Sequence, residues 1–475
     1  MTAVVSPVPV TVGDRPLVHL GLMRAHLTAS AVFLAVSLLA GLAFAFQFNQ
    51  LYPFPGIEWL SPGRVRMVHT NMAAYGFIAN AFIAGTLFAI PRLTRQPILS
   101  DRLGWLIFGA WQLILVLTIA GQLAGYGQGI EWGETPIFVD PLVLVGLVLL
   151  VINMATPILR SREPGLYVSL WYFLAAFAWT GLVYFMGNYL PQFWVPGTAG
   201  AAITGLFIHD LVGLFVTPLG WGLMYFFVPL LLRKPIWSHA LSLIGFWGLA
   251  FFYPMQGVHH FLFSPIPMYA QYGAVVATIA VEVVVFTVIV NFFGTLHGSA
   301  DAIRGNLALR WFFVGIVMYA ITCLQCAFQV TLTFQKIIHF TDWVVGHAHM
   351  VMFGVFGFWI FGLFVELWPR ALGRRWATPH LLTAHFWLTL IGLALMVIDL
   401  TAAGLVQGFS WASLAPWGAS VMASMPFWWA RTFAGLLIIA GQGLLFYAMW
   451  ATARQPVELP IHAPVPVGAA ARVAG

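Results

Sequence analysis

The sequence predicts an all-α fold, that of a polytopic membrane protein with twelve transmembrane helices. Of its 475 residues, 61% are hydrophobic and only 7% are charged. A soluble domain carries about 25% charged residues, so this chain cannot cover a surface that faces water and is expected to lie in a lipid bilayer. Twelve apolar segments are long enough to span it, which takes about 20 residues each. The net charge of +6 is therefore no sign of nucleic acid as a partner.

The apolar segments define the expected helices in chain order. They lie near residues 26–47, 67–90, 104–124, 138–157, 166–188, 200–232, 238–263, 268–294, 310–334, 345–368, 380–404 and 426–450. Pro218 and Gly220 predict a kink in the sixth segment. The transmembrane domain then covers residues 26–452, between a cytoplasmic N-terminal tail at 1–25 and a flexible C-terminal tail at 453–475.

Basic residues give the expected orientation, because Lys and Arg are enriched in cytoplasmic loops. Most of them follow the even-numbered segments up to the tenth: Arg92, Arg95, Arg102, Arg160, Arg162, Arg233, Lys234, Arg304, Arg310, Arg370, Arg374 and Arg375. The loops on the opposite side hold few cations. Both termini are therefore expected on the cytoplasmic side.

Six histidines then fall in the outer half of the membrane: His69, His209, His259, His260, His347 and His349. His69 and the pair at 347 and 349 come early in segments that start at the outer surface, and the pair at 259–260 comes late in a segment that ends there. His209 lies about 15 Å below the outer surface, at a rise of about 1.5 Å per residue. Such groups are costly at membrane depth unless they have partners. A cluster of metal and haem ligands explains them better than six independent core residues.

The spacing of these histidines suggests which of them could bind the same cofactor. His347 and His349 point about 200° apart on a helix, so they cannot easily share a metal but can each hold a different planar cofactor. The neighbours His259 and His260, with His209 at matching depth, suit a copper site of three imidazole nitrogens. A haem clamped between His69 and His349 would leave His347 for a second haem with one face open to a gas.

These residues stand in stretches that resemble the catalytic subunit of haem–copper oxidases, most of all the C family of cbb3-type cytochrome c oxidases. The matching stretches are RVRMVHTN around His69, YVSLWYF at 167–173, IHDLVGLFVT around His209, FWGLAFFYPMQGVHH and HFTDWVVGHAH. They span segments two to ten in matching order. Tyr253, six positions before the histidine pair, is the feature of the C family.

The resemblance implies a terminal oxidase in a bacterial inner membrane that reduces O₂ to water and couples this reaction to proton uptake and translocation. It implies two haem b groups: His69 and His349 would bind the low-spin haem, and His347 the high-spin haem. It implies copper at the other three histidines, and Tyr253 as a redox tyrosine linked covalently to His209.

Helical arithmetic places Ser238, Ser242 and Tyr253 near one stripe of their segment, joined by Thr217 from segment six. In the resembled family such a stripe is the single proton channel. The simpler interpretation is that the hydroxyl groups bond to the carbonyls of their own helices.

Other features concern cofactor contacts and partners. Arg66 and Trp343 are the expected partners of haem propionates at the outer surface. Glu131 stands in an EW pair like the acidic region where the family binds calcium. The sequence has no Cys-x-x-Cys-His motif, and its only cysteines, Cys323 and Cys326, are expected to serve packing. Electrons must then come from a partner, and the resemblance implies membrane-anchored c-type cytochrome subunits.

Three residues depart from the family pattern and keep an alternative open. Gln325 stands where the family usually has a glutamate, Asp210 where an uncharged amide is more usual, and Glu282 matches no family position. Nitric oxide reductases share the fold and the histidines, carry acidic residues near a non-haem iron, and lack the tyrosine. Tyr253 favours the oxidase over the reductase. A transporter would leave the histidines unexplained.

Overall fold

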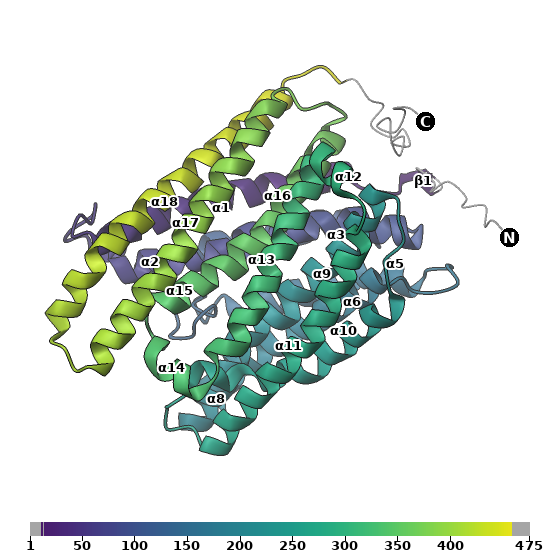
Figure 1. The fold of residues 1–475 in the computed structure, drawn as a ribbon. Helices are drawn as coiled ribbons and strands as arrows, with labels where there is room; N and C mark the ends of the chain where they lie inside the picture. Colours follow the sequence, from purple (N-terminus) through teal and green to yellow (C-terminus); the bar gives the residue numbers. More distant parts are fainter. Residues whose placement is uncertain (1–10, 13, 458–475) are drawn as a thin grey trace.

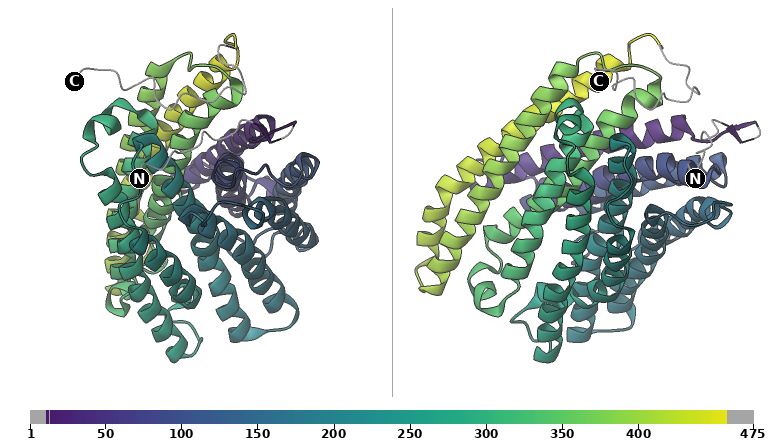
Figure 2. Two further views of the ribbon diagram at one scale, coloured as in Figure 1. Left: turned by 90° about the vertical axis from the view of Figure 1, so that its right-hand side faces the viewer. Right: turned by 45° about the vertical axis from the view of Figure 1, so that its right-hand side comes forward.

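The computed structural model of the chain describes residues 11–12 and 14–457. Its helices lie side by side in one bundle (Figure 1, Figure 2), and twelve continuous helical runs among the described residues are long and apolar enough to cross a membrane. The prediction of an all-α, twelve-span membrane fold is confirmed. The predicted tails at 1–25 and 453–475 lie partly outside the described residues.

The bundle is built from spans of one, two or three helical elements. In chain order they are Leu20–Phe48 (α1), Pro62–Thr94 (α2, η2, α3), Asp101–Ala124 (α4), Asp140–Leu159 (α5), Val168–Phe193 (α6, η3, α7), Gly197–Leu232 (α8, η4, α9), His239–Phe261 (α10, η5, η6), Met268–Leu296 (α11), Leu307–Gln329 (α13), Asp342–Leu372 (α15, η7, α16), Pro379–Ala412 (α17) and Trp417–Thr452 (α18). The composite spans divide into α2 Pro62–Asn71, η2 Met72–Ile78, α3 Ala79–Thr94, α6 Val168–Tyr184, η3 Phe185–Tyr189, α7 Leu190–Phe193, α8 Gly197–Asp210, η4 Leu211–Val216, α9 Thr217–Leu232, α10 His239–Phe252, η5 Tyr253–Met255, η6 Gly257–Phe261, α15 Asp342–His349, η7 Met350–Gly357 and α16 Phe358–Leu372. The remaining described elements are β1 Thr11–Val12, β2 Arg15–Pro16, η1 Glu58–Leu60, α12 Ala300–Gly305 and α14 Leu332–Ile338.

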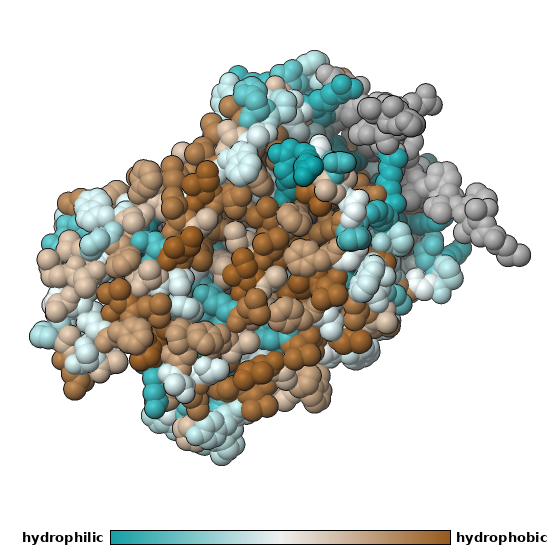
Figure 3. Space-filling view, viewed as in Figure 1, coloured by the Kyte–Doolittle hydropathy of each residue, from teal (hydrophilic) through white to brown (hydrophobic). Residues whose placement is uncertain are grey.

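Three spans form the interior of the bundle. The most apolar stretches of Pro62–Thr94, Gly197–Leu232 and Asp342–Leu372 are 94%, 94% and 78% buried, against 61% or less in the other spans. The outer spans present apolar side chains outward, and Figure 3 shows this hydrophobic surface over α11, α13 and α17, with hydrophilic residues gathered toward the ends of the bundle. Four of the six histidines lie in these enclosed spans, and each of the four is half-buried inside the bundle.

Several predicted boundaries are wrong. The first helix begins at Leu20 rather than at residue 26, and the predicted N-terminal tail contains the short antiparallel pair β1–β2. The predicted helix over 238–263 is interrupted: α10 ends at Phe252, and two short 3₁₀ turns follow. Pro254 lacks the amide hydrogen that would continue the α-helical ladder, which accounts for a break at this place.

Each of the three interior spans changes to a π-helical turn directly after its histidines. The π segments η2, η4 and η7 begin three residues after His69, two after His209 and one after His349. The predicted kink near Pro218 takes this form, since η4 ends at Val216, just before that proline. Wide turns of this kind are rare and occur frequently at functional sites. They shift the register of the following helix without ending it.

Helix α17 holds the last interior span in place through two glycines one turn apart. A Cβ atom on Gly404 would lie 2.1 Å from the amide nitrogen of Trp343, and one on Gly408 would lie 1.9 Å from the carbonyl oxygen of Ile337. Small residues at this spacing let membrane helices approach with their backbones in contact. The contact fixes α14 and α15, and α15 carries His347 and His349.

Substitution of Gly408 by alanine is therefore expected to destabilise the protein. The added methyl group would overlap backbone atoms of α14, and overpacking of this kind costs about 1–3 kcal/mol. The midpoint temperature of unfolding of the detergent-solubilised protein should fall. Gly443→Ala in α18 is the matched control, because nothing lies within 4 Å of its Cβ position. Equal midpoints for the two variants would contradict this packing.

Candidate haem and metal site

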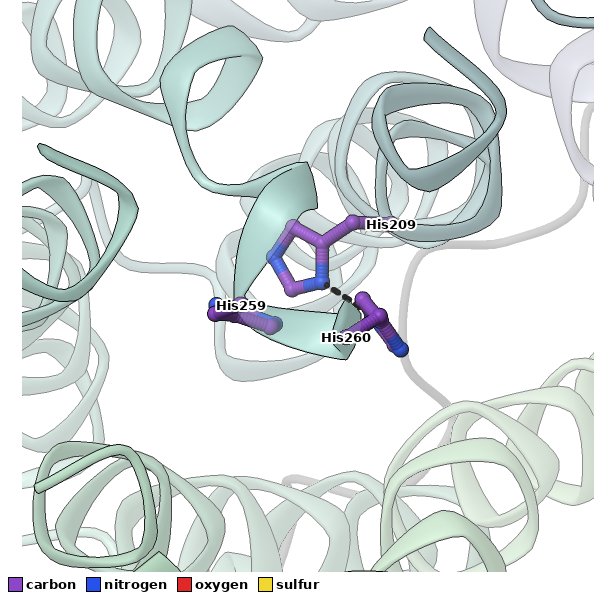
Figure 4. Close-up of side chains that lie close together, drawn as sticks. All are labelled: His209, His259 and His260. Carbon is purple, nitrogen blue, oxygen red and sulfur yellow. Dashed lines mark hydrogen bonds between the residues drawn. The ribbon is translucent and has the colours of Figure 1, made fainter. Parts of the chain in front are cut away.

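Three histidines from two elements converge at the centre of the site (Figure 4). His209 comes from the end of α8, and His259 and His260 come from the 3₁₀ turn η6. Their ligand nitrogens all lie within 4.8 Å of one another, and Nδ1 of His209 is 3.1 Å from Nε2 of His260. A Cβ on Gly257 would lie 2.3 Å from Cα of Leu206, so the two elements touch backbone to backbone. Three neutral imidazoles this close suit copper.

The other ring nitrogens in this cluster are held by neutral groups. Nε2 of His209 lies 3.1 Å from Oε1 of Gln256, and Nδ1 of His259 lies 2.7 Å from Oγ1 of Thr278 on α11. Such partners fix the tautomer and orientation of a metal-binding imidazole. Both were missed by sequence reasoning, because each is an ordinary polar residue whose role appears only when α11 and η5–η6 are packed against α8.

Tyr253 stacks on the ring of His209, with ring centroids 4.7 Å apart and an angle of 16° between the planes. It is the first residue of η5, not part of a continuous helix. The helical arithmetic that places Tyr253 on one stripe with Ser238 and Ser242 therefore assumed a helix that ends one residue earlier. The position of Gly213 makes the stack possible, because a Cβ there would lie 1.6 Å from a carbon of the tyrosine ring.

His69 and His349 face each other across a gap between α2 and α15. Their ring centroids are 6.2 Å apart and their planes differ by 24°. Two imidazoles on opposite sides of one metal ion, with metal–nitrogen bonds of about 2 Å, have centroids about 6 Å apart. Nδ1 of each ring lies 2.8 Å from a backbone carbonyl, that of Ser37 or Val345 respectively. The Nε2 atoms are thus left for a shared iron, and the geometry fits a haem held from both sides.

His347 turns to different neighbours. Its Nδ1 lies 2.9 Å from Oε1 of Gln325 and its Nε2 lies 3.4 Å from Sγ of Cys326, both on α13. Because His347 and His349 are two residues apart on one helix, their rings point in different directions: His347 contacts α13, and His349 faces His69. Nδ1 is bound to an amide oxygen, whereas Nε2 makes a long contact with a thiol, so Nε2 is the nitrogen available as an iron ligand to a haem bound on one side.

The predicted outer-surface residues lie nearby but have protein partners. Arg66 forms an ion pair with Glu134 at 3.1 Å, and the Trp343 indole donates to Oε1 of Gln329 at 3.0 Å. Glu131, the predicted calcium ligand, is exposed, whereas Glu134 is 2% exposed and also accepts from the amide of Asn71. Glu134 is therefore the buried acid in the loop between α4 and α5. In the sequence, only its position three residues after Glu131 pointed to it.

The predicted serine stripe does not form a connected chain among the described residues. The Ser238 hydroxyl caps its helix by accepting from the amide of Leu241, and the Ser242 hydroxyl donates to the carbonyl of His239. Thr217 is buried on α9. The Ser242 bond is the one that the simpler interpretation of the sequence expected, whereas Ser238 accepts a hydrogen bond as the N-cap of α10.

Two buried acids border the site. Asp210 is fully buried, and neither of its carboxylate oxygens has a hydrogen-bond partner. Together with Tyr75 and Tyr184, Asp210 lines a small cavity of about 20 Å³. A cavity of this size has room for one or two water molecules. Glu282 on α11 is 7% exposed and lies beside Cys323 and Cys326. The two cysteines therefore stand beside the site rather than serving packing alone.

One further histidine belongs to the surroundings of the site. His339, in the loop between α14 and α15, bonds through its ring to the backbone carbonyl of His260. Partial burial lowers the pKa of this imidazole, while the hydrogen bond acts in the opposite direction. Sequence reasoning did not single it out, because it lies outside the apolar segments.

Twelve spans surround a pair of facing histidines and a cluster of three histidines, and this arrangement can be compared with known proteins. The backbone matches a haem–copper terminal oxidase dimer solved by cryo-electron microscopy, with a TM-score of 0.75 and 15% identity over 94% of this chain and 88% of that chain. This match shows the haem–copper oxidase fold. The sequence then places the chain more narrowly: it belongs to the family of cytochrome c and quinol oxidase polypeptide I, whose model matches residues 21–437.

Curated relatives agree with this family. The chain is 29% identical to cytochrome c oxidase subunit 1 of Rhodobacter capsulatus, over 94% of this chain and 88% of the relative. It is 26% identical to a cbb3-type cytochrome c oxidase subunit of Stutzerimonas stutzeri, over 86% of this chain and 90% of the relative. The chain is thus a multi-pass membrane oxidoreductase of the cytochrome c oxidase type, a catalytic subunit whose family implies haem and copper cofactors and cytochrome partners.

Proposed function

We propose that this protein is the catalytic subunit of a cbb3-type terminal oxidase that reduces O₂ to water and couples the reaction to proton uptake and translocation across the membrane. The observation that carries this proposal is the stack of Tyr253 on His209 within the three-histidine cluster. A phenol beside a metal-binding imidazole can supply both a proton and an electron. A relative named as a cbb3-type subunit supports the same assignment.

The six histidines would divide among three cofactors. His69 and His349 would hold a low-spin haem b, His347 a high-spin haem b, and the remaining three copper. When bound, these groups supply the electrons and the binding of O₂. The chain's own residues orient them: carbonyls and amides fix the ring nitrogens that do not bind metal, and Tyr253 holds a proton at its hydroxyl oxygen next to the cluster.

Orientation, electron supply and proton supply complete the proposal. The distribution of basic residues favours both termini on the cytoplasmic side of a bacterial inner membrane, and an even number of spans returns the chain to the side on which it started. No Cys-x-x-Cys-His motif occurs in the sequence, so electrons would enter from membrane-anchored c-type cytochrome subunits. Protons would approach along the side of α10 and α9 that carries Ser238, Ser242 and Thr217.

A nitric oxide reductase with a non-haem iron in place of copper is the second candidate. Asp210 and Glu282 favour it, because both are buried acids beside the cluster and neither has a basic partner among the ion pairs of the described residues. Tyr253 opposes it. Turnover of the purified complex with O₂ and with NO separates the two: O₂ reduction should be the faster reaction, and turnover of NO alone would establish the reductase.

The haem assignment predicts a selective spectral loss. His349→Ala removes one of two ligands to the low-spin haem, so the absorption bands of that haem should disappear while some high-spin haem remains. The measurement is the reduced-minus-oxidised optical spectrum of the purified protein. His380→Ala, at an exposed position, should leave both sets of bands unchanged. Retention of the low-spin bands in the His349 variant would contradict the assignment.

The role of Tyr253 predicts a large kinetic loss. Tyr253→Phe keeps the ring that stacks on His209 but removes the hydroxyl, and positioned proton donors contribute about 10²–10⁴-fold to rate. O₂ consumption should fall by at least about 10²-fold with haem content unchanged. Tyr447→Phe, at an exposed position, is the control and should retain the parental rate. An O₂ reduction rate for the Tyr253 variant equal to that of this control would remove the proposed role.

A further inference from the structure

The Nδ1 atom of His347 is held by a side chain, that of Gln325, to which the proposed function assigns no role. Oε1 of Gln325 lies 2.9 Å from Nδ1 of His347. Gln325 is half-buried on α13, one turn before Gln329, whose Oε1 accepts from the indole of Trp343. Helix α13 thus presents two amide oxygens in successive turns to α15, and the first of them meets the one histidine proposed to bind iron from one side only.

None of the six histidines has a carboxylate as a hydrogen-bond partner among the described residues. Their partners are backbone carbonyls, a threonine hydroxyl, a thiol, amide oxygens and one another. Two buried acids, Asp210 and Glu282, border the site, but neither bonds to one of these ring nitrogens among the described residues. Glu282 lies beside the thiols of Cys323 and Cys326, and Asp210 faces a cavity. Every ring nitrogen of the six histidines that has a hydrogen-bond partner is therefore bound by an uncharged group.

The charge of the partner matters because it sets how strongly the imidazole donates to a metal. A carboxylate that accepts the Nδ1 proton draws it away from the ring and raises the basicity of Nε2, whereas a neutral acceptor does so less. Hydrogen bonds to ionised acceptors are roughly twice as strong as those to neutral ones. A more basic ligand stabilises the oxidised iron and lowers its reduction potential. Glutamine carries an amide where glutamate carries a carboxylate. The residue at position 325 therefore determines whether Nδ1 of His347 meets a neutral or a charged acceptor.

We propose that Gln325 is a positioning residue that keeps His347 a weakly donating imidazole, and so raises the reduction potential of the iron that His347 would hold. The inference rests on the proposed function, because it needs a haem on His347. It assigns to the Gln325 amide an effect on electron uptake: the site where oxygen reacts would accept an electron from the His69–His349 haem more readily than it would with a carboxylate at the same place.

The test compares three variants with the parental protein. Gln325→Glu places an ionisable carboxyl group on Nδ1, Gln325→Met removes the acceptor at similar volume, and Gln329→Glu makes the same charge change one turn along α13 without touching a histidine. The midpoint potential of the high-spin haem is measured by redox titration from mildly acidic to alkaline pH. The iron–histidine stretching frequency of the reduced protein is measured by resonance Raman spectroscopy.

Gln325→Glu should lower the midpoint potential of the high-spin haem and raise the iron–histidine frequency, most of all at alkaline pH, where the new carboxyl group is ionised. Gln325→Met should lower that frequency below the parental value. Gln329→Glu should leave the frequency unchanged and shift the potential less. Low-spin haem bands should be the same in all three.

Two results would overturn the inference. One is a potential for Gln325→Glu that equals that of Gln329→Glu throughout the pH range. The other is a parental iron–histidine frequency in Gln325→Met. The proposed function is judged separately, by haem content and turnover of the parental protein. A parental protein with both haems that does not respond to the Gln325 variants would therefore overturn this inference alone.

Discussion

The cost of placing polar nitrogens inside a bilayer governs the architecture of this protein. An unpartnered polar group in an apolar medium costs several kcal/mol, and six imidazoles carry twelve ring nitrogens. Four of the six imidazoles lie in the most buried spans of the bundle. Most of the twelve ring nitrogens also have a hydrogen-bond partner. Nε2 of His69 and Nε2 of His349 have no such partner among the described residues, and their rings face each other where a metal ion fits.

Close backbone approach is the second requirement, because imidazoles from different helices must come within a few ångströms. Glycines supply it at several contacts made by the elements of the site. Gly257 lets η6 touch α8, Gly213 makes room for the Tyr253 ring, and a Cβ on Gly41 would lie 2.6 Å from Nδ1 of His69. The packing that stabilises the bundle and the geometry that assembles the site are therefore the same contacts.

Composition and apolar segments predicted the fold class and the number of spans, since a bilayer sets a strong length requirement on every helix. The identities and grouping of the histidines were also predictable, because spacing and topology place them at one depth. The opposite directions of His347 and His349 follow from helix geometry alone. Their separate neighbours, α13 for one and His69 for the other, are what such geometry leads one to expect.

Other features depend on hydrogen-bond register and tertiary packing, which carry little sequence signal. The π-helical turns after His69, His209 and His349 follow no residue pattern, yet they set how the following helices pack. The break at Tyr253 invalidated the helical arithmetic for that residue, although the contact with His209 exists. Glu134 rather than Glu131 pairs with Arg66, because loop residues lack a periodic pattern that would show which side chain is buried.

The central claim is that three histidines hold copper while the other three hold two haems. Quantitative metal and haem analysis of the purified complex tests it most directly, after correction for haem in any partner subunit. The account predicts about one copper and two haem b groups per chain. Two haems with a non-haem iron and no copper would contradict it, and would favour the reduction of nitric oxide.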